Sequence, residues 1–211
     1  MKRLLLIGSI FFLFSCQSAY YSAMEKFGVE KRDILVDRVE SAKESQEDAQ
    51  QQFSSALEQF IQLTNYDGGE LQKVYENLKS QFEDSQGSAE IVTARIDKVE
   101  TVADDLFAEW QQEMKKYSSD KLRRDSQKKF TNTKRRYSSL LKAMRKAESK
   151  MAPVLTAMQD NVLYLKHNLN ASAISGLQGE FGNIKQEIDQ LIKEMNVAIE
   201  QSNAFIISMK N

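Results

Sequence analysis

Cys16 is the residue of this chain best suited to covalent chemistry, because it holds the only thiol. It follows Lys2 and Arg3, an apolar run over residues 4–14, and the small residue Ser15. A basic start, an apolar run too short to span a bilayer and a small residue at the cut site are typical of an export signal. Bacterial lipoprotein signals have this form, and the lipidated cysteine becomes the mature N-terminus. An ordinary secretory signal is the alternative, but it leaves the free thiol unexplained.

These features divide the chain into three parts. We predict a lipoprotein signal peptide over 1–15, a lipid-anchored tether over 16–29 and a single helical domain over 30–211. No second apolar run of spanning length follows Cys16, so we expect the protein to be exported and anchored to the cell envelope. If the source is Gram-negative, Gln17 favours the outer membrane facing the periplasm, because aspartate at that place usually retains lipoproteins in the inner membrane.

Residues for catalysis are scarce elsewhere. His167 is the only histidine, and it lies near a predicted helix end, where interaction with the helix dipole explains it. No second histidine or free cysteine completes a zinc site or a nucleophile–base pair, and no phosphate-binding Gly-x-x-x-x-Gly-Lys-Ser/Thr motif occurs. We therefore expect no enzyme activity, no catalytic residue, no metal and no cofactor.

The second chemical feature is a concentration of positive charge. Residues 121–150 contain twelve Lys or Arg and two acids, although the whole chain has a net charge of −1. Within a helix over this range, four cations recur every seven residues on the side opposite the apolar seam: Lys121, Lys128, Arg135 and Lys142. We call these four residues the basic stripe. Lys129 and Arg136 flank the seam, and we expect them to reach toward a neighbouring helix.

Two interpretations of this charge remain open. The cations could form a solvated face, partly paired with the six acids of residues 97–113, which would lie alongside 124–140 in a hairpin turning at Ser118. Alternatively they bind an anionic partner, either lipid headgroups, lipopolysaccharide phosphates or an acidic envelope protein. Nucleic acid is a poor candidate, because the export signal removes the chain from DNA.

The elements that position these residues must be long helices. The chain has one proline and eight glycines, too few for many turns. Apolar residues alternate at spacings of three and four over 35–63, 92–110, 130–165 and 174–209, which is typical of helices packed at shallow angles. The sequence therefore predicts an all-α fold, an elongated antiparallel helical bundle or coiled coil of about four long helices.

Turn signals place the helix ends. Breaks are expected at Gly68–Gly69, at Ser118–Ser119 and at 168–172, and Gly87 marks a kink rather than a hairpin. With this topology the Ser118 turn lies at the end of the tether and projects about 20 Å past the first helix, at 1.5 Å per residue. Additional apolar residues either fill the core or support a homo-oligomer: Leu141, Leu155, Val162 and Ile206.

Several segments resemble a proteobacterial family of coiled-coil lipoproteins whose domain has no assigned function. The similar segments are residues 24–28, 31–39, 105–110, 122–124, 143–148, 153–155, 165–171 and 177–180. The resemblance implies a helical lipoprotein facing the periplasm and supplies no catalytic residues. Relatives sometimes carry an automatic DNA-repair ATPase label, which nothing in this sequence supports.

The sequence thus predicts a non-enzymatic envelope lipoprotein with a structural or protein-interaction role. The alternative is a membrane-surface effector that binds anionic lipid headgroups through residues 121–150.

Overall fold

The computed structural model describes residues 30–64, 71–168 and 171–210, and within these ranges every regular element is an α-helix. The described helices are α2 (Lys31–Thr64), α3 (Leu71–Met114), α4 (Asp120–His167) and α5 (Ala171–Lys210). The all-α prediction is therefore confirmed. Cys16, the predicted signal peptide and the whole predicted tether over 16–29 lie outside the described residues.

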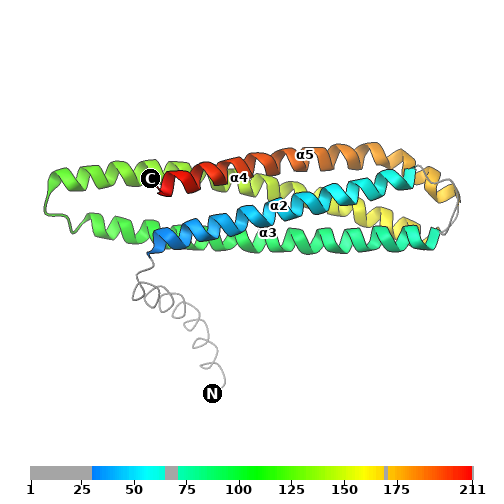
Figure 1. Ribbon diagram of the computed structural model, residues 1–211, viewed down its shortest axis with the longest axis horizontal. Helices are drawn as coiled ribbons and strands as arrows, with labels where there is room; N and C mark the ends of the chain where they lie inside the picture. The colour runs from blue at the N-terminus through cyan, green and yellow to red at the C-terminus, as the bar shows by residue number, and fades with distance from the viewer. Residues whose placement is uncertain (1–29, 65–70, 169–170, 211) are drawn as a thin grey trace, which may run out of the picture.

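The helices form an elongated antiparallel bundle (Figure 1). In cyclic order, α2 packs against α3, α3 against α4, α4 against α5, and α5 back against α2. None of the described helices combines the length and the apolar character needed to cross a bilayer. The bundle thus buries its apolar seams in one shared core along its length.

Most of the core consists of the predicted heptad positions, although Phe107 is buried where Leu106 was predicted. Leu35, Ile96, Leu140 and Ile188, one from each helix, are fully buried. Burial of each such side chain contributes about 1.5–3 kcal/mol relative to exposure. The additional apolar residues belong to the same core, since Val162 and Ile206 are buried and Leu141 and Leu155 pack against it.

The helix ends follow the predicted turn signals. Ser119 caps α4, accepting a hydrogen bond at Oγ from the backbone N–H of Leu122 at 3.4 Å. No hairpin forms at Gly87, because α3 continues through it from Leu71 to Met114. This continuity makes α3 long enough to pair with α4 up to the Ser118 turn.

The α3–α4 hairpin has the predicted register. Trp110 Nε1 donates a hydrogen bond to Ser126 Oγ at 2.9 Å, and the rings of Phe107 and Phe130 meet edge to face at 5.6 Å. α3 and α4 contain 44 and 48 residues against 34 in α2. The hairpin consequently projects past the beginning of α2 and the end of α5 (Figure 1).

Candidate functional site

The basic stripe lies on the outer face of α4. All four of its side chains are exposed, as their position opposite the seam predicted. Seven residues correspond to about 10.5 Å of helix, so the four cations form a line rather than one compact site. Such a line suits an extended anionic surface better than a small ligand.

Most of the cations of α4 form no ion pair with the part of the chain that the structure describes. Among the twelve cations of residues 121–150, only three form ion pairs with described residues: Arg123 with Asp120, Lys146 with Glu194, and Arg145 with a cluster of acids. The other nine cations of residues 121–150 form no ion pair with any described residue: Lys121, Arg124, Lys128, Lys129, Lys134, Arg135, Arg136, Lys142 and Lys150. The predicted intrachain pairing is therefore partial.

Arg145 occupies much of the available negative charge. Its Nη2 lies 2.6 Å from Asp97 Oδ1 and also pairs with Glu100, while its Nη1 lies 3.0 Å from Glu148 Oε2. Burial lowers the pKa of the guanidinium, but hydrogen bonds to the three carboxylates outweigh that effect and raise it. One arginine thus neutralises two of the acids that face the hairpin.

Glu109, a third acid of that group, pairs with another helix. Its Oε2 lies 2.9 Å from the Nζ of Lys31 at the beginning of α2. Three of the six acids of residues 97–113 thus form interhelical ion pairs, and none of the three pairs with the basic stripe.

The aromatic residues among these cations belong to the core. Phe130 and Tyr137 are buried, and Lys134 Nζ lies 5.8 Å from the Phe130 ring centroid. Burial raises the pKa of the Tyr137 hydroxyl, and the nearby Asp104 raises it further. Because these rings face inward, they offer no stacking surface to a nucleic-acid base.

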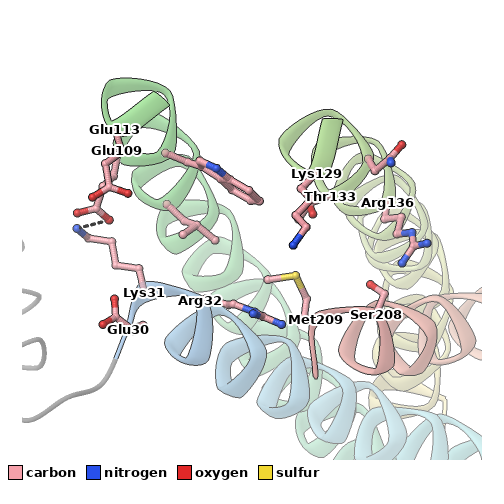
Figure 2. A pocket seen from close by; sticks show the side chains of 13 residues that line it. Glu30, Lys31, Arg32, Glu109, Glu113, Lys129, Thr133, Arg136, Ser208 and Met209 are labelled. Carbon is pink, nitrogen blue, oxygen red and sulfur yellow. Dashed lines mark ion pairs between the residues drawn. The ribbon is translucent and has the colours of Figure 1, made fainter. Parts of the chain in front are cut away.

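Lys129 and Arg136 do not belong to the outer face but line a cleft of about 650 Å³ (Figure 2). The structure adds Arg32 to them, a residue that sequence reasoning missed. Arg32 comes from α2, and only the packing of helices of unequal length brings it opposite this turn of α4. The excess length of α3 and α4 over α2 is the sequence signal that could have indicated such an encounter.

The other predicted positions have a simple structural context. His167 is exposed as the last residue of α4, followed by Asn168, whose N–H donates to Leu165 O at 3.1 Å. Among the residues that the structure describes, no group of three or more His, Cys, Asp or Glu side chains is placed to hold a metal ion. The lipidation prediction at Cys16 lies outside the described part of the chain.

Comparison with protein families gives a match that covers most of the chain. A family model described as a protein of unknown function (DUF2959) matches residues 20–209. No curated protein and no solved structure matches the chain. The match supports the resemblance at the level of a family of unknown function, and lipidation and bacterial origin stay predictions.

Proposed function

The chain belongs to the DUF2959 family, and on that premise we propose that it is a non-enzymatic lipoprotein of the cell envelope with a structural or protein-interaction role. In this proposal Cys16 carries the lipid, and the bundle faces the periplasm from the outer membrane if the cell is Gram-negative. The observation that carries the proposal is the basic stripe on the outer face of α4, whose four exposed cations form no ion pair with any described residue.

An acidic protein is the partner that fits this face. Cations that repel one another along a helix are stabilised when a negatively charged surface covers them. Charge complementarity also accelerates association and selects the partner. The stripe spans three heptads, about 32 Å of helix, which matches a long acidic helix or sheet edge.

Photo-crosslinking in the intact envelope tests this proposal. A crosslinking amino acid replaces Ser138 on the exposed side of α4, and Asn203 on the exposed side of α5 serves as the matched position. A defined adduct from position 138 alone, lost when the four cations of the basic stripe become glutamine, supports docking on this face. Equal adducts from both positions, or an adduct that persists in the charge variant, would contradict it.

A second function is favoured by the projecting hairpin. Tyr117 and Leu122 are 40% and 54% exposed there, beside Lys115, Lys116 and Lys121. Aromatic and leucine side chains flanked by lysines suit the boundary between headgroups and acyl chains. The alternative is thus a membrane-surface effector in which the hairpin and the stripe bind anionic lipid headgroups, each cation contributing about 1 kcal/mol.

Sedimentation with vesicles separates the two functions. A chain beginning at Gln17, without lipid, is mixed with neutral or anionic vesicles at low and high salt. The surface effector predicts binding to anionic vesicles only, weakened by salt and at least tenfold by glutamine at the four stripe positions. A control variant carries the same charge change at exposed lysines outside residues 121–150: Lys79, Lys98, Lys166 and Lys193. Absence of binding to either vesicle rules this function out and leaves the protein partner.

A further inference from the structure

The cleft beside Lys129 originates from the unequal lengths of the helices. α2 begins at Lys31 and α5 ends at Lys210, whereas α3 and α4 continue past both ends. Beyond this level neither α2 nor α5 covers the inner faces of α3 and α4, and among the described residues a cleft of about 650 Å³ opens between them. This volume lies within the range of about 300–1,000 Å³ that small-molecule sites occupy.

Two helix faces form the walls. α3 contributes Leu106, Glu109, Trp110 and Glu113, and α4 contributes Lys129, Asn132, Thr133 and Arg136. Each set has the spacing i, i+3, i+4, i+7 of one helical face, so the side chains of both sets lie along the cleft. The first residues of α2 and the last residues of α5 close the bottom.

The cleft has an apolar floor. Leu106 and Trp110 are heptad positions that would be buried if α2 and α5 extended further, and here they are only partly covered. Met209 of α5 completes the apolar surface. The Trp110 indole is held in place by its hydrogen bond to Ser126 Oγ at 2.9 Å and by edge-to-face packing on Phe130. The floor is therefore preformed.

Charge is segregated across the cleft. Figure 2 shows Arg32, Lys129 and Arg136 directed toward Met209 and Ser208, with Thr133 between the two α4 cations. None of these three cations forms an ion pair with a described residue. The acids lie on the other side, and Glu109 is already paired with Lys31 at 2.9 Å. Two positive charges from the α4 wall and one from α2 at the bottom thus line the cleft beside its apolar floor.

We propose that this cleft binds a single-chain amphiphile with an anionic head, such as a fatty acid or a lipid monophosphate. Arg32, Lys129 and Arg136 bind the carboxylate or phosphate, since Arg and Lys form charge-assisted hydrogen bonds with such oxygens. The acyl chain lies on Leu106, Trp110 and Met209, where it removes apolar surface from water. The site differs from the basic stripe, and its occupation does not depend on vesicle or protein docking.

Trp110 provides the assay, because it is the only tryptophan in the sequence. The chain beginning at Gln17, which contains the whole described bundle, is titrated with dodecyl phosphate or dodecanoate below their micelle concentrations. We expect a saturable blue shift of Trp110 emission as the alkyl chain of the ligand replaces water over the indole. Octyl analogues are expected to bind at least tenfold more weakly, since each methylene contributes up to about fourfold in affinity.

The charge requirement is tested with matched variants. Changing Arg32, Lys129 and Arg136 together to glutamine is expected to weaken binding at least tenfold. The same three-charge change at Lys121, Lys128 and Arg135 on the basic stripe should leave the affinity within twofold, and circular dichroism verifies that both variants fold.

Several results would overturn the proposal. No saturable shift with either anionic amphiphile would remove the site. Equal binding of dodecanol or dodecyltrimethylammonium, or unchanged binding in the cleft variant, would show that the cleft does not recognise an anionic head. Because this assay contains no vesicle and no protein partner, its failure is distinguishable from failure of the proposed function.

Discussion

Replacing Gln46 by leucine is expected to stabilise the protein. Gln46 occupies a heptad position of α2, its side chain is fully buried, and neither its amide oxygen nor its amide nitrogen has a hydrogen-bond partner among the described residues. A buried polar group without a partner costs about 1–3 kcal/mol. Leucine removes both unpartnered atoms, and its different shape costs less than about 1.5 kcal/mol. The expected net change is about +2 kcal/mol in the free energy of unfolding.

Urea unfolding followed by circular dichroism measures this change. With a slope of about 2 kcal/mol/M, a gain of about 2 kcal/mol moves the midpoint upward by about 1 M at constant slope. Gln51→Leu is the matched control, because Gln51 is exposed on the same helix. That substitution should change stability by no more than about 0.5 kcal/mol.

An unchanged or lowered midpoint for Gln46→Leu would refute the reasoning, because it would mean that the amide is hydrogen-bonded in solution. A polar residue at a heptad position can also fix helix register and oligomeric state at a cost in stability. Sedimentation equilibrium of both variants therefore accompanies the unfolding curves, and a change of assembly in Gln46→Leu alone would assign that role to the amide.

Three further predictions concern stability. Tyr137→Phe removes a buried hydroxyl that has no partner among the described residues, and it should add about 1 kcal/mol to the free energy of unfolding at pH 8. Because burial raises the pKa of Tyr137, the free energy of unfolding of the wild type is unaffected by this group below about pH 10 and falls above it. The gain measured by urea unfolding should therefore widen at higher pH, and a constant gain would contradict the pKa shift. Gly179→Ala and Gly182→Ala should each add about 0.5–1 kcal/mol, since an added Cβ meets nothing within 4 Å inside α5, and a lower melting temperature would contradict this. Phe107→Ala should cost about 3–5 kcal/mol and Leu106→Ala clearly less, since only Phe107 is buried; equal losses in urea unfolding would place Leu106 in the core.

Most of the fold could be predicted because heptad spacing states directly which side of each helix is buried. The sequence seam of the second predicted helix continues through Leu106 and Trp110, and along most of the bundle such positions are covered. At this end the structure buries Phe107 instead and leaves Leu106 and Trp110 partly exposed. Spacing reports the side of a helix that faces inward, but it does not report where the neighbouring helices stop.

The candidate site, like the fold, could be predicted from the sequence only in part. The outward direction of the basic stripe follows from its place opposite the seam, so it was predictable from one helix alone. Arg32 lies on α2, whereas Lys129 and Arg136 lie on α4. These two helices are not neighbours in the cyclic order of the bundle. Only the packed bundle, with its helix ends at known levels, brings these three cations to one cleft.

The length difference among the helices links both candidate surfaces to the predicted anchor. α3 and α4 exceed α2, so the hairpin projects and the cleft opens at the same end of the bundle, where α2 begins (Figure 1). The predicted tether over 16–29 leads into that beginning, and an extended segment of 14 residues reaches at most about 50 Å. If Cys16 carries a lipid, the hairpin, the near end of the stripe and the cleft are the parts of the bundle held closest to the membrane. Amphiphiles that leave the bilayer as single molecules would then meet the cleft within the reach of the tether.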